Sequence, residues 1–213
     1  MSEKSARRSP RPADRLRDPE RTRAAIIDAA TKEFAAHGYA GARVSTIASR
    51  AGVNQQLISY YFDGKEGLAR AIAERWRDRE DDLVAVDTPF PEQIRRYALE
   101  ALNNPENVRL LAWSGLEYSG PDSDPDFNSR SERLTRNADQ VRALLANSDL
   151  PEGIDPSTLM VMLMGAAMAP IFLPQVIRAL GNTDATSEEF LRSYADQVAQ
   201  LTSAVIGEPR KNT

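Results

Sequence analysis

Apolar residues recur every three to four positions along almost the whole chain, and no segment alternates apolar and polar residues as a half-buried strand does. Prolines and glycines interrupt this helical pattern at intervals. They delimit nine expected helices, at residues 18–37, 44–51, 54–61, 65–83, 91–103, 105–119, 127–147, 155–181 and 187–206. The sequence therefore predicts an all-α protein of about nine helices.

Local signals mark where several of these helices begin and end. The pairs Asp18–Pro19 and Asp155–Pro156 each put an N-cap aspartate before a proline at the first helical position. Asn54 is a further N-cap, and Gly38 ends the first helix. His37 lies in the last turn before that glycine. We interpret it as a solvated residue near the negative end of the helix dipole rather than as a catalytic base.

The expected helices form two domains between two tails. Residues 1–17 contain two prolines, three serines and six basic residues, with almost nothing to bury, so we expect a disordered basic arm. Residues 18–79 form the first domain and residues 80–207 the second, and residues 208–213 form a flexible tail.

Charge is divided unevenly along the chain. Residues 1–70 carry 13 Lys/Arg against 8 Asp/Glu, whereas residues 71–213 carry 14 against 23. A basic N-terminal part followed by an acidic remainder is typical of a protein whose N-terminal part binds a polyanion. A chance distribution of a few charges explains the division equally well.

The composition leaves little room for enzymatic or metal chemistry. The chain has no Cys and a single His, which excludes a disulfide framework, a thiol nucleophile and a multi-histidine metal site. It also lacks a glycine-rich phosphate loop, a nucleophile elbow and a His-Glu-x-x-His motif. We therefore expect no enzyme activity, no cofactor and no metal.

No segment has the properties of a secretion signal or a membrane span. The first residues contain no apolar stretch. The longest apolar run, residues 159–173, is 15 residues long and contains Pro170, whereas a helix needs about 20 residues to cross a bilayer. We expect a cytoplasmic protein without a membrane partner.

The short helices expected at residues 44–51 and 54–61 are joined by a turn of small residues that contains Gly52. In a helix-turn-helix, the second helix enters the major groove of DNA, and the side chains at its N-terminal end reach base edges. Gln55 and Gln56 stand at that end, and a glutamine amide can both donate to and accept from adenine. The pattern predicts a DNA-reading helix.

Three further side chains suit the DNA backbone. Tyr60 and Tyr61 offer hydroxyls, and Lys65 offers an ammonium group, to the flanking phosphates. Taken singly, each also fits an ordinary surface or core position. Their occurrence together in the basic part of the chain favours the DNA-binding interpretation.

These segments resemble the DNA-binding domain of TetR-type transcriptional repressors. The resemblance rests on residues 43–53 (RVSTIASRAGV), 58–62 (ISYYF) and 65–68 (KEGL), and it extends over residues 19–70, a quarter of the chain. It implies an all-helical, Ω-shaped homodimer that binds double-stranded DNA through its second and third helices. It also implies a divergent C-terminal domain that binds a small effector and dimerises through its last two helices.

The resemblance assigns roles to individual positions. The base-reading positions are Ser45, Gln55, Gln56 and Leu57. The phosphate-contacting positions are Thr46, Tyr60, Tyr61 and Lys65. The positions that hold the helices together are Ile47, Ala48, Ala51, Val53, Ile58 and Phe62.

Three positions depart from the family pattern. Arg43 stands where a threonine often caps the second helix, so either Ser45 caps it instead or Arg43 contacts phosphate. Gln56 replaces a residue that is often small, and Ser59 one that is often a tyrosine. No known operator sequence can therefore be transferred. The arginines of the basic arm either lie in a minor groove or form a solubilising tail; they are Arg7, Arg8, Arg11, Arg15 and Arg17.

The second domain gives weaker signals. Four of the five methionines crowd the helix expected at residues 155–181, and thioether side chains suit both apolar pockets and plain packing. The pocket candidates are Trp113, Tyr118, Met160, Met164, Met168 and Phe172. The dimer-interface candidates, which we favour for this region, are Ala166, Ala169, Phe190, Tyr194, Val198, Leu201 and Val205.

The sequence thus predicts a sequence-specific, DNA-binding transcriptional regulator. We expect a repressor that binds a palindromic operator as a homodimer and is released by a small-molecule effector. The alternatives are an all-helical protein-interaction module without sequence-specific DNA binding and, with less support, a helical enzyme. Neither the effector nor the operator follows from the residues.

Overall fold

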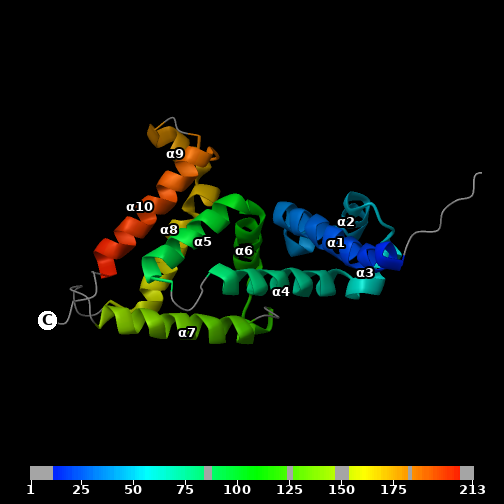
Figure 1. Cartoon of the computed structure of the whole chain (residues 1–213), viewed down its shortest axis with the longest axis horizontal. Coiled ribbons are helices and arrows are strands. Elements are labelled where there is room, and N and C mark those ends of the chain that lie inside the picture. The colour runs from blue at the N-terminus through cyan, green and yellow to red at the C-terminus, as the bar shows by residue number, and fades with distance from the viewer. Residues whose placement is uncertain (1–11, 84–87, 124–126, 147–153, 182–183, 207–213) are drawn as a thin grey trace, which may run out of the picture. The chain divides into compact units, whose positions relative to one another are not determined.

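The structure is a computed structural model, and it describes residues 12–83, 88–123, 127–146, 154–181 and 184–206 (Figure 1). Within these residues the chain forms ten α-helices and one short 3-10 helix, Pro121–Ser123, and no strand. The all-α prediction is confirmed. The chain divides into two compact units, Met1–Ile72 and Ala73–Thr213.

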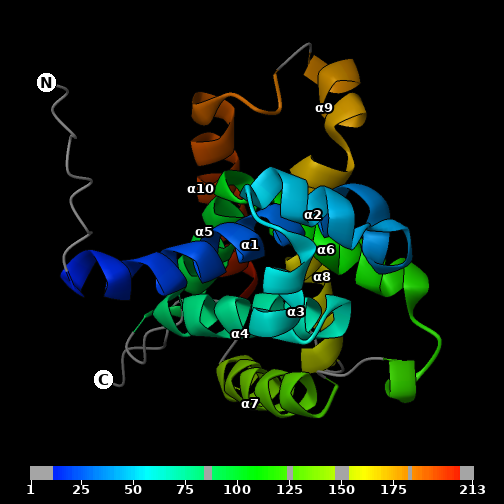
Figure 2. The ribbon, with the colours of Figure 1, turned by 90° about the vertical axis from the view of Figure 1, so that its right-hand side faces the viewer.

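The first unit contains helices α1 (Pro12–Gly41), α2 (Val44–Ala51), α3 (Gln55–Phe62) and the start of α4 (Lys65–Leu83). Helix α2 packs on α1, and α3 packs on α2, as Figure 2 shows. Each helix turns an apolar stripe inward, and these stripes form one core. Its buried residues include Ile26, Ile27, Ala30, Phe34, Ile47, Ala48, Ile58, Phe62 and Leu68.

Helix α1 begins earlier than predicted. It starts at Pro12, so Asp18 does not cap it and Pro19 lies inside the helix. The preceding residues include alanine, leucine and arginines, which are strong helix formers, and they continue the helix despite the hydrogen bond that a proline removes. The predicted end is confirmed at Gly38, whose φ of 70° and ψ of 175° interrupt the helical backbone.

The second unit contains α5 (Phe90–Asn103), α6 (Pro105–Glu117), α7 (Phe127–Leu145), α8 (Pro156–Phe172), α9 (Pro174–Gly181) and α10 (Glu188–Ile206). Helix α5 packs against both α8 and α10, and α8 also contacts α7. The core formed by these helices contains Phe90, Ile94, Val141, Leu159, Val198 and Ile206. These six residues come from four helices, and four of them are β-branched.

The methionine-rich segment expected as one helix at residues 155–181 forms two helices. Helix α8 ends at Phe172, and α9 begins at Pro174, with a bend of 78° between them. The Asp155 side chain accepts a hydrogen bond of 2.7 Å from the Thr158 backbone N–H, so it is the predicted N-cap. No single helix among the described residues is long and apolar enough to span a membrane; the bent pair of α8 and α9 meets that test on length and composition alone.

Candidate nucleic-acid interface

The turn between α2 and α3 is built from two residues with special backbone roles. Gly52 adopts the left-handed conformation, with φ 69° and ψ 29°, which a residue without a Cβ does at no steric cost. The Asn54 side chain then accepts a hydrogen bond of 2.9 Å from the Leu57 N–H. This cap satisfies one of the free donors at the start of α3. The helix-turn-helix predicted from the sequence is therefore present.

The two helices bury one face and leave the other accessible. Ile47 and Ala48 of α2, with Ile58 and Phe62 of α3, are buried. The guanidinium of Arg23 in α1 lies 5.2 Å from the centroid of the Phe62 ring, which adds a cation–π contact. The inward side chains hold the helices, and the outward side chains remain free to meet a ligand.

Most predicted DNA contacts are accessible. Ser45, Gln55, Gln56 and Arg43 are exposed. Tyr60 is 80% exposed, an unusual position for a large aromatic side chain. The remaining four, Thr46, Leu57, Tyr61 and Lys65, are half-buried.

The tyrosines and the lysine make contacts that orient them. The rings of Tyr60 and Tyr61 meet edge to face, with centroids 5.2 Å apart. The Lys65 ammonium donates to the carbonyl oxygen of Ala40 at 3.2 Å and lies 4.8 Å from the centroid of the Tyr39 ring. An ammonium group has three donors, so this bond leaves Lys65 able to contact a phosphate as well.

Helix α2 starts in a way that the sequence did not reveal. Arg43 is its N-cap residue, but no side chain caps the helix. Instead, the Arg43 backbone N–H donates to Oε1 of Glu33 in α1 at 3.3 Å. The same carboxylate lies 3.8 Å from the Arg50 guanidinium near the other end of α2 and 3.5 Å from Nδ1 of His37. Glu33 is buried, so a carboxylate on α1 contacts residues near both ends of α2.

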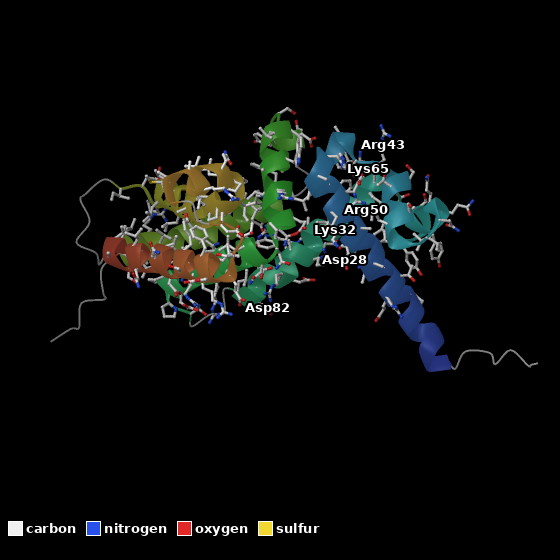
Figure 3. The ribbon with its side chains drawn as sticks, turned by 90° about the horizontal axis from the view of Figure 1, so that it is seen from above. Asp28, Lys32, Arg43, Arg50, Lys65 and Asp82 are labelled. Carbon is white, nitrogen blue, oxygen red and sulfur yellow. The ribbon has the colours of Figure 1, made fainter. Side chains whose placement is uncertain are left out.

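Basic side chains come from several elements of the first unit. Figure 3 labels Arg43, which precedes α2, and Arg50, which lies in the last turn of α2. It also labels Lys65 of α4 and Lys32 of α1. All four are lysines or arginines, the residues that neutralise phosphate charge. Arg7, Arg8 and Arg11 lie outside the described residues, and Arg15 and Arg17 lie on α1, where only the backbone is described.

Comparison with known proteins agrees with this geometry. The family described as bacterial regulatory proteins, tetR family, matches residues 26–72, and a tetracyclin repressor-like C-terminal domain matches residues 90–200. The HTH-type transcriptional repressor SCO4008 of Streptomyces coelicolor is 35% identical to this chain over 178 residues, which cover 81% of this chain and 90% of that protein. The chain belongs to the TetR family.

Other relatives and solved structures agree. The HTH-type transcriptional regulator SrpR of Pseudomonas putida is 27% identical and covers 89% of this chain and 84% of its own. The crystal structure of the regulator SCO4942 of Streptomyces coelicolor has a TM-score of 0.68 at 25% identity, covering 85% of this chain and 97% of that chain. The present TetR-family member is therefore a DNA-binding regulator of transcription.

The second unit of this TetR-family protein separates the residues predicted for an apolar pocket. Met160 packs against the core, whereas Met164, Tyr118 and Phe172 are exposed. Trp113 and Met168 are half-buried. A cleft that the structure does describe in this unit is lined by none of these six residues.

The residues predicted for the dimer interface are also divided. Val198 is buried in the core, and Ala166, Tyr194 and Val205 pack against that core, with the Tyr194 hydroxyl donating to the Ala166 carbonyl oxygen at 2.7 Å. Ala169 and Phe190 are half-buried. Leu201 is 67% exposed. The inward-facing side of α10 thus packs against its own chain, and only part of the predicted dimer interface is accessible to a partner.

Proposed function

We propose that this protein is a repressor that binds a two-fold-symmetric operator as a homodimer and is released from it by a small-molecule effector. The observation that carries the proposal is the capped, accessible N-terminal turn of α3, where Gln55 and Gln56 are exposed beside Asn54. A helix presented in this way suits the major groove. Operator binding as a dimer and release by an effector are typical of the TetR family.

Each predicted DNA-contacting position, exposed or half-buried, has a proposed role on DNA. Ser45, Gln55, Gln56 and Leu57 read base edges, and Gln55 and Gln56 are suited to adenine. The phosphate contacts come from Arg43, Thr46, Tyr60, Tyr61 and Lys65, and they fix the register of α3 in the groove. The two copies of α3 in the dimer would lie about 34–36 Å apart to occupy successive major grooves.

The proposed dimer surface lies on the last three helices. Helix α9 has no buried residue, and its Leu180 is 84% exposed. Val161 and Met162 of α8 and Leu201 of α10 are also exposed. An exposed apolar surface of this kind is typical of a protein–protein interface. We leave Val198 out of the proposed interface because it is buried within its own chain.

The test is to select bound sequences from a pool of random DNA and to titrate the recovered site at two salt concentrations. We expect a palindromic site and an affinity that falls steeply with salt, because each phosphate contact releases counterions. Selection of a single, non-repeated half-site would contradict the dimer. If no sequence is enriched, the alternative of a protein-interaction module is favoured. In that case the basic N-terminal part would bind an acidic partner without reading bases.

A further inference from the structure

A cleft of about 330 Å³ in the second unit is lined entirely by polar residues. They come from the second half of α4 and from α5 and α7, which can be followed in Figure 1. The volume lies at the lower end of the range for small-molecule sites. An apolar ligand would gain little here, because most of the surface that lines the cleft is polar.

The inner wall of the cleft is a fixed and neutralised network. Glu80 accepts a hydrogen bond from the Tyr97 hydroxyl and another from Nε of Arg133, both at 3.1 Å. Arg133 also donates to the Ser129 hydroxyl at 2.9 Å. Burial raises the pKa of Tyr97, and the Glu80 charge raises it further. The phenol therefore stays a donor at neutral pH, and Glu80 contributes shape and hydrogen bonding rather than an open charge.

Two opposite charges remain open at the cleft. Asp81 of α4 and Arg136 of α7 both line it, both are exposed, and neither forms an ion pair with another described residue. Gln93 of α5 is buried, and its amide nitrogen already donates to the Thr88 carbonyl oxygen at 2.8 Å. Its amide oxygen is left as an acceptor. Two further amides, Asn137 and Gln140, complete the lining.

We propose that this cleft binds a small zwitterion of the amino-acid class. Its carboxylate would pair with Arg136 and its ammonium group with Asp81, and the amides of Gln93, Asn137 and Gln140 would accept or donate the remaining hydrogen bonds. A molecule with one charge only, or with none, would leave at least one of these two groups unpaired. Binding of the zwitterion does not depend on the proposed function. Its consequence, that the bound zwitterion changes operator affinity, rests on the proposed function.

Binding is tested on the full-length protein with each of the twenty standard amino acids as the probe, by calorimetric titration and by thermal unfolding. Glucose and decanoate serve as a neutral polar probe and an apolar anionic probe. We expect at least one amino acid to bind saturably and to raise the melting temperature, since a ligand of the folded state stabilises it. Binding of decanoate or glucose without any amino acid would overturn the proposal.

Variants then locate the site. Arg136→Gln and Asp81→Asn should each weaken amino-acid binding by about tenfold, the loss expected for a charged hydrogen bond. The matched controls are Arg142→Gln, on the same helix as Arg136, and Asp82→Asn, next to Asp81; neither residue lines the cleft. Unchanged binding in both cleft variants would overturn the proposal. Circular dichroism of all four variants checks that each is folded.

The operator assay separates this inference from the proposed function. If the amino acid binds through Arg136 and Asp81 but leaves operator affinity unchanged, the cleft assignment stands and effector release through it is contradicted. If an unrelated compound releases the operator equally well from the wild type and from Arg136→Gln, effector release stands. In that case the absence of amino-acid binding in the titrations would overturn the cleft assignment alone.

Discussion

At the residue scale, DNA recognition depends on a few side chains whose exposure differs from that of their neighbours. Gln55 and Gln56 are exposed at the capped end of α3, whereas Ile58, two residues further along, is fully buried. The buried residue fixes the helix, and the exposed glutamines can approach bases. Base contacts specify sequence and phosphate contacts set position, so substitutions in the two groups should have different consequences.

We predict that Gln55→Ala weakens binding to the selected operator by about 1–3 kcal/mol and relaxes the preference at one base pair. The measurement is a titration against the operator and against all single-base variants of it. Tyr60→Phe is the contrast, because loss of a phosphate contact should weaken binding evenly across sequences. An even loss for Gln55→Ala would make Gln55 a backbone contact instead.

Glu33 gives a second prediction at this scale. Its Oε2 has no hydrogen-bond partner among the described residues, although its Oε1 accepts from the Arg43 N–H. Glu33→Ala should lower the free energy of unfolding by about 1–3 kcal/mol, because it leaves that N–H without its acceptor. Glu33→Gln keeps an acceptor and should cost less. Urea unfolding measures both, and equal losses would show that the charge facing Arg50 matters more than the hydrogen bond.

At the element scale, the helix starts show which features can be predicted from sequence. Asn54 and Asp155 cap their helices as expected, because a cap involves only the three following residues. The pair Asp18–Pro19 has the same pattern but lies inside α1, since the preceding residues also favour a helix. A cap pattern therefore marks a helix start only where the residues before it disfavour one.

The cap of α8 predicts a pH dependence. The hydrogen bond from the Thr158 N–H lowers the pKa of Asp155 below its ordinary value of 3.8. Near that pH the unfolded chain binds more protons than the folded chain, so this contribution to stability is present above about pH 4 and is lost as the pH falls further. Asn also caps well, so Asp155→Asn should keep the neutral-pH stability and flatten the acid limb of the stability curve. Urea midpoints between pH 2.5 and 7 measure this, and an unchanged acid limb would contradict it.

At the scale of the whole molecule, the helix-turn-helix could be predicted from the sequence, whereas the polar cleft could not. The helix-turn-helix is contiguous, so its residues could be recognised from their spacing within residues 43–68. The cleft combines Asp81, Gln93 and Arg136 from three helices, and each looks like an ordinary surface residue in its own helix. The methionines, which did stand out, are divided between the core and the exposed surface. A site assembled from helices that are distant in the sequence can be recognised only once the fold is known.

The proposed homodimer is the feature on which operator recognition depends, because a single α3 reads only half of a palindrome. Leu201→Glu puts a charge on the exposed apolar surface of α10 and should convert the dimer to a monomer, since an unpaired charge buried in an interface is costly. The loss of one half-site should also reduce operator affinity and lessen its dependence on salt. Leu116→Glu is the matched control: Leu116 is 78% exposed and lies on α6, outside the proposed surface. Sedimentation equilibrium gives the masses of both variants. If Leu116→Glu separates the subunits and Leu201→Glu does not, the interface lies on α6 rather than on the last three helices.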